Sequence, residues 1–190
     1  MKSIVFASAN ENKVKEIQHK LGGHLHIQGL KEIGCHEEIP EEQDTLEGNA
    51  RQKAWYIWNN YKVNCFADDT GLEVYALGMQ PGVFSARYAG DQKKSADNIA
   101  LLLKNMETIH DRRARFRTVI CLIENGVERL FEGIAEGTIQ RDLRGADGFG
   151  YDPIFVPLGN SRTFAEMSME EKNIISHRAK AIGLLRGWLG

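Results

Sequence analysis

The N-terminal third of the chain alternates apolar runs of strand length with apolar residues at helical spacing. Compact apolar runs favour β-strands, whereas apolar residues that recur on one face of a helix favour amphipathic helices. The predicted elements are a strand at 3–7, a helix over 14–21, a strand at 25–30 and a helix that begins after Asp44 or Thr45 and reaches Tyr61. This alternation predicts an α/β protein.

The stretch from Phe66 to Val74 joins two extended pieces through four polar or small residues, Asp-Asp-Thr-Gly, which predict a turn. Adjacent carboxylates at the end of a strand repel each other unless a cation shares them. Asp68 and Asp69 are therefore candidates for a Mg²⁺ site or a general base. The same residue types also form ordinary turns by bonding their own backbone, so this alternative stays open.

The C-terminal half predicts a β-hairpin and a long final helix. Two β-forming runs, 115–123 and 130–139, flank Asn125-Gly126, a dipeptide that favours a two-residue hairpin turn. An antiparallel hairpin makes the sheet mixed rather than all-parallel. A capping box of Ser168 and Glu171 begins an amphipathic helix that we expect to run to Trp188.

Composition narrows the class of protein. A chain of 190 residues, 42% of them hydrophobic, can bury one core, so we expect a single domain over residues 1–190. The 24 Lys and Arg residues against 26 Asp and Glu give a formal net charge of −2, which argues against a nucleic-acid partner.

The three cysteines, Cys35, Cys65 and Cys121, are far apart and odd in number, which argues against a disulfide framework or a structural zinc. The apolar run at the N-terminus is too short for a signal peptide, and no segment of transmembrane length follows it. We therefore expect a cytoplasmic protein without a membrane partner.

Two further segments carry candidate chemistry. The turn before the first helix places Ser8, Asn10 and Lys13 around free backbone N–H groups that could hold phosphates, although helix capping favours the same residues. The Gly-rich loop 145–155 offers Phe149 as a flat surface for a planar base, or as a simple core anchor.

The final helix adds a group of polar residues near its first half: Lys172, Ser176, His177 and Arg178. Each alone is typical of a solvated helix face. Together they could form a cationic clamp for phosphate and polar groups for a base edge.

Five segments resemble, in order and spacing, the inosine triphosphate pyrophosphatase family, whose members hydrolyse non-standard purine nucleoside triphosphates such as ITP, dITP and XTP. The matching segments are Ser8–Lys13, Phe66–Leu72, Pro81–Tyr88, Phe149–Phe155 and Ser176–Ala179. The resemblance spans nearly the whole chain. It implies an elongated mixed β-sheet with flanking helices, two lobes around a nucleotide-binding cleft, Mg²⁺ as cofactor and a homodimer.

The resemblance also implies roles for single residues. Asp69 would be the general base and a metal ligand, with Asp68 beside it and Glu41 as the further metal carboxylate. Gly48 stands where bacterial members typically have Glu, which leaves Glu42 as an alternative to Glu41.

The implied substrate contacts fall into two groups. Phe149 would stack on the base, Lys172 would hold phosphate, and His177 with Arg178 would read the purine edge. The other implied contacts are Ser8, Ala9, Asn10, Glu11, Asn12 and Lys13 toward the triphosphate, Thr70 toward the substrate, and Gly150, Tyr151 and Asp152 around the base.

Two other functions fit the same residues. A pyrophosphatase for modified pyrimidine or methylated nucleotides would share the acidic residues but would not need the purine wall. A non-catalytic nucleotide-binding module would use the same residues, and its adjacent acids would merely close a turn.

Overall fold

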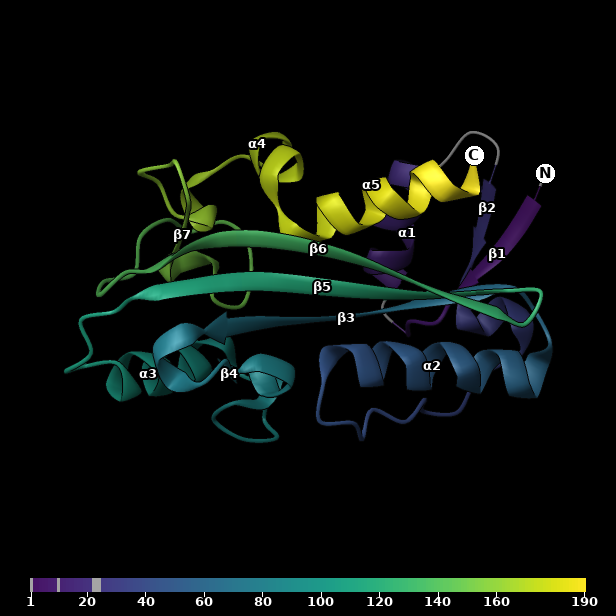
Figure 1. Ribbon diagram of the computed structural model, residues 1–190, viewed down its shortest axis with the longest axis horizontal. Coiled ribbons are helices and arrows are strands. Elements are labelled where there is room, and N and C mark those ends of the chain that lie inside the picture. Colours follow the sequence, from purple (N-terminus) through teal and green to yellow (C-terminus); the bar gives the residue numbers. More distant parts are fainter. Residues whose placement is uncertain (1, 10, 22–24) are drawn as a thin grey trace. The chain divides into compact units, whose positions relative to one another are not determined.

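The computed structural model describes residues 2–9, 11–21 and 25–190. Its helices and strands alternate along the first half of the chain, as the hydrophobic pattern predicts (Figure 1). The elements are β1 (Lys2–Phe6), α1 (Glu11–Leu21), β2 (Leu25–Gln28), α2 (Leu46–Tyr61), β3 (Cys65–Val74), β4 (Gln80–Pro81), α3 (Ser95–Asn105), β5 (Arg113–Glu124), β6 (Val127–Ile139), β7 (Phe155–Pro157), α4 (Met169–Ile175) and α5 (His177–Leu189).

The described strands form one seven-stranded mixed sheet in the order β2-β1-β3-β5-β6-β7, with β4 paired to β3. β1 is parallel to both β2 and β3, whereas β4 and β7 pair antiparallel with β3 and β6. The predicted hairpin is confirmed, because Asn125 and Gly126 both have the positive φ that a tight turn between β5 and β6 requires (Figure 1). The predicted mixed α/β fold is therefore correct.

The chain divides into two compact units. Unit 1 comprises the described residues of Met1–Asp69, Val119–Glu132 and Ala181–Gly190, and unit 2 comprises Thr70–Thr118 and Gly133–Lys180. Three strands, β3, β5 and β6, contribute residues to both units. The expectation of a single domain stays a prediction.

Each unit has its own apolar core. In unit 1, Phe6 and Phe66 stack with ring centroids 4.8 Å apart, and apolar residues of α1, β1, β2 and α5 surround them. In unit 2, the rings of Phe116, Phe155 and Phe164 pack together among residues of α3 and the strands. Aromatic clusters of this kind bury much apolar area.

The predicted turn at Asp68-Asp69-Thr70-Gly71 is wrong, because β3 continues through all four residues. Neighbouring strands hold them extended. The hydroxyl groups of Thr70 and Thr118 share a hydrogen bond of 2.8 Å, and a Cβ added to Gly71 would lie 2.3 Å from the Gly82 carbonyl oxygen. Packing across the sheet thus overrides the turn preference of these residue types.

The single long C-terminal helix is also wrong. The chain is extended at Ser176, with φ −69° and ψ 151°, and this residue separates α4 from α5. Its backbone N–H donates to the Lys172 carbonyl, and its hydroxyl accepts from the backbone N–H of Ala179. Ser176 therefore ends one helix and caps the next, as serine commonly does.

The interruption changes which residues face solvent. Ile174 and Trp188 are exposed rather than buried on the expected apolar face. The predicted capping box of Ser168 and Glu171 is confirmed at the start of α4.

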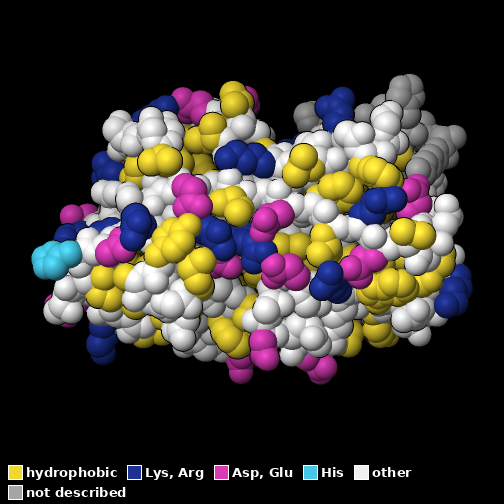
Figure 2. Space-filling view, in the orientation of Figure 1, with side chains coloured by type: hydrophobic (Ala, Val, Ile, Leu, Met, Phe, Trp, Pro, Cys, Tyr) yellow, Lys and Arg dark blue, Asp and Glu magenta, His cyan; other side chains and the backbone are white. Residues whose placement is uncertain are grey.

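Basic and acidic side chains of the described residues are interspersed on the face drawn in Figure 2. On that face the small net charge therefore reflects local mixing rather than separate charged fields. Among the described residues, no helix combines the length and the hydrophobicity that a membrane span requires.

Candidate functional site

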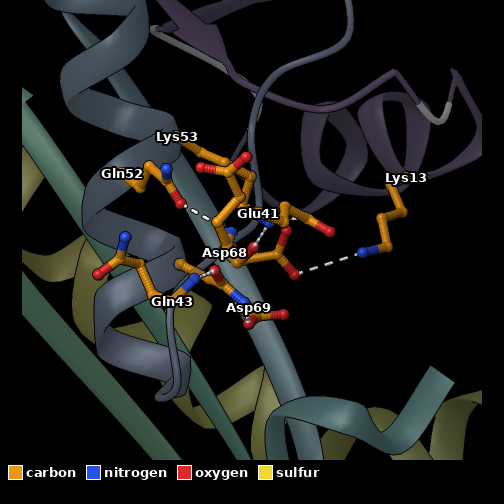
Figure 3. Close-up of polar contacts among 9 residues, drawn as sticks. Lys13, Glu41, Gln43, Gln52, Lys53, Asp68 and Asp69 are labelled. Atoms are coloured by element: carbon orange, nitrogen blue, oxygen red, sulfur yellow. Dashed lines mark hydrogen bonds and ion pairs between the residues drawn. The ribbon is translucent and has the colours of Figure 1, made fainter. Parts of the chain in front are cut away.

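The acidic pair lies in the middle of β3. Successive residues of a strand point to opposite faces, so Asp68 and Asp69 meet different neighbours. The Asp68 side chain is buried and its carboxylate lies 3.6 Å from Lys13 Nζ (Figure 3). Asp69 is partly exposed, and its Oδ2 accepts a hydrogen bond of 3.1 Å from the side-chain amide of Asn49.

A buried lysine that the sequence reasoning missed joins these acids. Lys53 Nζ donates to the Asp68 carbonyl oxygen over 2.7 Å and to Glu41 Oε1 over 2.5 Å (Figure 3). Burial is the largest influence on the pKa of this lysine and lowers it. The carboxylates of Asp68, Asp69 and Glu41 outweigh burial together, so the pKa is raised above its ordinary value.

The helical period contains a signal for this lysine. Asn49 and Lys53 are four residues apart, and both side chains are buried beside Ala50, Ala54 and Ile57 on the inner face of α2. Two polar side chains on an otherwise apolar helix face need buried partners, which is a reason to suspect a site.

The loop before α2 carries both alternatives for the further carboxylate, Glu41 and Glu42. The carboxylate of Glu41 contacts Lys53, whereas the backbone N–H of the neighbouring Glu42 donates to Gln52 Oε1 at 2.9 Å. Thr45 caps α2 by accepting from the backbone N–H of Gly48. The loop thus directs Glu41 toward the acidic pair.

The acidic cluster has the donor chemistry that Mg²⁺ prefers. Its candidate ligands are the carboxylate oxygens of Glu41, Asp68 and Asp69, but the described residues contain no group of three or more His, Cys, Asp or Glu arranged around one metal position. Sites that act on phosphates commonly hold Mg²⁺ through one or two carboxylates and the substrate's own oxygens. The residues fit a cation that arrives with a phosphate ligand.

The first turn is only partly described. Asn10 lies outside the described residues, and Glu11 and Asn12 belong to α1 without described side chains. Ser8 and Ala9 line a cavity of about 400 Å³ together with residues of the segment 29–37. Lys13, in the first turn of α1, contacts the acidic pair through the carboxylate of Asp68.

In unit 2, a second group of predicted residues forms around an exposed aromatic ring. The Phe149 side chain is 65% exposed. Lys172 Nζ lies 4.9 Å from its ring centroid and Arg178 Cζ lies 5.6 Å from it. An exposed ring flanked by cations can stack a planar base and bind its polar edge.

The loop that carries Phe149 is fixed by two buried residues. Asp152 accepts a hydrogen bond of 2.9 Å from the Phe149 backbone N–H and forms an ion pair with Lys172. The hydroxyl of Tyr151 donates to the Ser85 carbonyl oxygen at 2.9 Å, and burial raises the pKa of this tyrosine. Gly150, between Phe149 and Tyr151, has a φ of +60°, which favours glycine.

His177 and Arg178, which directly follow the interruption at Ser176, are the remaining members of the group around Phe149. His177 is buried, and its ring stacks on Phe116 with centroids 4.8 Å apart. Arg178 is in the first turn of α5, and its guanidinium group lies over the Phe149 ring. Thr70, which the resemblance predicts to contact the substrate, forms a hydrogen bond with the hydroxyl group of Thr118 within unit 2.

Comparisons with known proteins match nearly the whole chain to one protein family. The model of the Ham1 family matches residues 4–188. The chain is 52% identical over 190 residues to a dITP/XTP pyrophosphatase of Porphyromonas gingivalis, covering 100% of this chain and 98% of the relative. It is 54% identical over 178 residues to a dITP/XTP pyrophosphatase of Flavobacterium psychrophilum, with 94% of each chain covered.

Solved structures show the same fold. The Ham1 protein of Staphylococcus aureus superposes with a TM-score of 0.94 at 38% identity, covering 99% of this chain and 98% of the other. A nucleoside-triphosphatase, or dITP/XTP pyrophosphatase, of Mycobacterium abscessus gives a TM-score of 0.84 at 40% identity, covering 96% and 98%.

Proposed function

Since this chain belongs to the Ham1 family, we propose that it hydrolyses the purine nucleoside triphosphates dITP, ITP and XTP to the monophosphate and pyrophosphate. The observation that carries this proposal is the 52% identity, over the entire chain, to a relative named for dITP and XTP. The polar clusters of both units supply the chemistry that such a reaction needs. In a cell, this activity would remove damaged purines from the nucleotide pool.

The residues around β3 would bind the phosphate groups of the substrate. A triphosphate carries several negative charges, and the leaving pyrophosphate gains more, so cations must stabilise the transition state. Lys13 and Lys53 provide two of them next to the acidic pair. The first turn of α1 would add backbone N–H groups.

Asp69 is the proposed general base. Its carboxylate takes a proton from a water molecule whose oxygen attacks the α-phosphorus, and the bond to the bridging oxygen breaks as pyrophosphate leaves. Mg²⁺, held by Glu41 and Asp69 with Asp68 beside them, would neutralise charge on the phosphate oxygens.

The residues around Phe149 would bind the purine base of the substrate. The ring would stack on the purine, and Lys172 would exchange its contact with Asp152 for a substrate phosphate. Inosine and xanthosine carry an oxygen acceptor at the purine 6-position, where adenine carries an amino donor. Arg178 donates to the oxygen but would face adenine's donor, which disfavours ATP by a few kcal/mol, on the order of one lost buried hydrogen bond.

The direct test is to incubate the purified protein with dITP, ITP, XTP, ATP and GTP, with and without Mg²⁺, and to identify the products. We expect rapid, metal-dependent release of pyrophosphate and monophosphate from dITP, ITP and XTP. Release of orthophosphate, or a preference for modified pyrimidine nucleotides, would contradict the proposal. Tight binding without turnover would favour a nucleotide-binding module.

We also propose that the protein acts in the cytoplasm as a homodimer, in line with the family resemblance. Size-exclusion chromatography with light scattering tests the assembly directly. A mass near the 21.4 kDa of one chain, at every concentration tried, would exclude the dimer.

A further inference from the structure

We propose that Asn49 is the positioning residue of this site, fixing the carboxylate of Asp69 and tying it to the loop that carries Glu41. This inference rests on the proposed function, in which Asp69 is the general base. Asn49 lies in the first turn of α2, and its side chain is almost fully buried, with 3% exposure.

The two ends of the Asn49 amide have different partners. Its Nδ2 donates to Asp69 Oδ2 at 3.1 Å, and its Oδ1 accepts from the backbone N–H of Gln43 at 2.9 Å. Gln43 and Asp69 are drawn together in Figure 3. A backbone N–H can only donate and a carboxylate can only accept, so the reversed amide would lose both bonds. The orientation of this side chain is therefore set by its partners.

Local packing brings Gln43 to this position. Thr45 caps the helix through the Gly48 N–H, which folds the preceding loop over the first turn of α2. A Cβ added to Gly48 would lie 2.6 Å from Gln43 Cβ, a distance that real side chains do not adopt. Glycine at position 48 thus lets the Gln43 backbone come close to Asn49. Position 48 is also where the resemblance leads us to expect Glu, so this close approach of Gln43 is specific to a chain with glycine there.

The arrangement suits a residue that acts through Asp69. The amide carries no charge, so it restricts the Asp69 side chain while leaving the balance between the acids and the two lysines unchanged. A misplacement of about 1 Å in a reacting group can cost on the order of 100-fold in rate. Loss of Asn49 should therefore lower kcat more than it changes KM.

The test compares Asn49→Ala and Asn49→Asp with a matched control. Asn49→Asp keeps the size of the side chain and the acceptor for Gln43, but it replaces the donor to Asp69 by a carboxylate oxygen and adds a negative charge there. A control must therefore also add a buried carboxylate. The control is Asn98→Asp, which alters another buried asparagine that accepts from the Ala89 N–H and donates to the Ala86 carbonyl.

The readouts are kcat and KM for dITP at saturating Mg²⁺, with the thermal midpoint measured for each variant. For both Asn49 variants we expect kcat to fall by about 10- to 100-fold, with KM within roughly threefold of wild type. The Asn98→Asp variant should lose thermal stability but keep kcat. An unchanged kcat in folded Asn49→Asp overturns the inference, even if Asn49→Ala does not fold.

A double-mutant cycle separates this inference from the proposed function. If Asn49 acts through Asp69, then Asn49→Ala should lower the residual rate of Asp69→Asn no further. Equal losses in both backgrounds would overturn the positioning role while leaving Asp69 as the base. A wild-type rate in Asp69→Asn alone would instead refute the base assignment, and the inference with it.

Discussion

At the scale of single residues, Lys53 is a buried cation that joins Glu41 to the backbone of Asp68. We predict that Lys53→Met lowers kcat/KM for dITP by on the order of 100-fold, since it removes a cation placed where charge develops. Stability should fall by about 1–3 kcal/mol because the buried Asp68 carbonyl loses its donor. Steady-state kinetics and urea unfolding measure the two effects.

The matched control is Lys180→Met. Lys180 Nζ donates to the Ile134 carbonyl, and this contact is exposed on unit 2. Its replacement should leave the kinetic constants unchanged. A Lys53→Met variant that is destabilised but fully active would show that this lysine only neutralises its neighbours.

Phe149 allows a different residue-scale prediction because its ring is largely exposed and contributes little to the core. Phe149→Ala should raise KM for dITP by roughly 5- to 150-fold, which corresponds to one lost stacking contact of about 1–3 kcal/mol. The thermal midpoint should hardly move. Phe149→Trp should retain most of the affinity, and Leu158→Ala, at another exposed apolar residue of unit 2, serves as the control.

At the scale of elements, the carboxylate of Glu37 is one of several groups that hold the loop before α2 against that helix. The hydroxyl of Tyr61 donates to Glu37 at 2.7 Å, and that of Tyr56 donates to it at 3.1 Å. The bond from Tyr61 is the largest cause that lowers the pKa of Glu37 from 4.5 to about 2. A depressed folded-state pKa means that Glu37 stabilises the fold above its ordinary pKa and loses this effect as pH falls toward 2.

We therefore predict that Glu37→Gln is less stable than wild type at pH 7 and that the difference disappears between about pH 4.5 and 2. The difference should be small because the group is exposed. Urea unfolding of both proteins across this range measures it. Glu38→Gln removes the adjacent carboxylate as a control. A difference independent of pH would show that the bonds to the tyrosines do not require the ionised carboxylate.

Elements that depend on local sequence patterns could be predicted, whereas elements that depend on distant contacts could not. The strand at β1, the helix at α1 and the hairpin turn at Asn125-Gly126 follow from local patterns, and the structure contains them. The extended path of β3 through Asp68 and Asp69, and the position of the His177 ring after Ser176, involve partners far away in the chain. Thr118 and Phe116, both on β5, are two such partners, and no local pattern identifies them.

The residues of the candidate site likewise fall into those that the sequence could predict and those that it could not. Roles for Glu41, Asp68 and Lys172 could be predicted from the family resemblance, which needs no knowledge of the fold. Lys53 and Asn49 could not, since their importance lies in contacts with β3 and with the preceding loop. A buried polar pair on a helix face is the pattern that would have indicated them.

At the scale of the whole molecule, three strands contribute residues to both units, so a unit cannot lose its strands without affecting the other. All three tryptophans, Trp55, Trp58 and Trp188, belong to unit 1. Tryptophan fluorescence therefore reports the unfolding of unit 1 alone, whereas far-ultraviolet circular dichroism reports both units. The two probes can measure how strongly the units are coupled.

We predict that a core substitution in unit 2 lowers the unfolding midpoint seen by fluorescence in unit 1. Phe164 is fully buried in the unit 2 core, and Phe164→Ala should cost about 3–5 kcal/mol. At roughly 2–4 °C per kcal/mol for a chain of this size, both probes should shift downward together by about 6–20 °C. Leu158→Ala, at an exposed position of the same unit, should shift neither probe. An unmoved fluorescence transition beside a split dichroism curve would mean that the units unfold independently, and that the shared strands do not transmit stability between them.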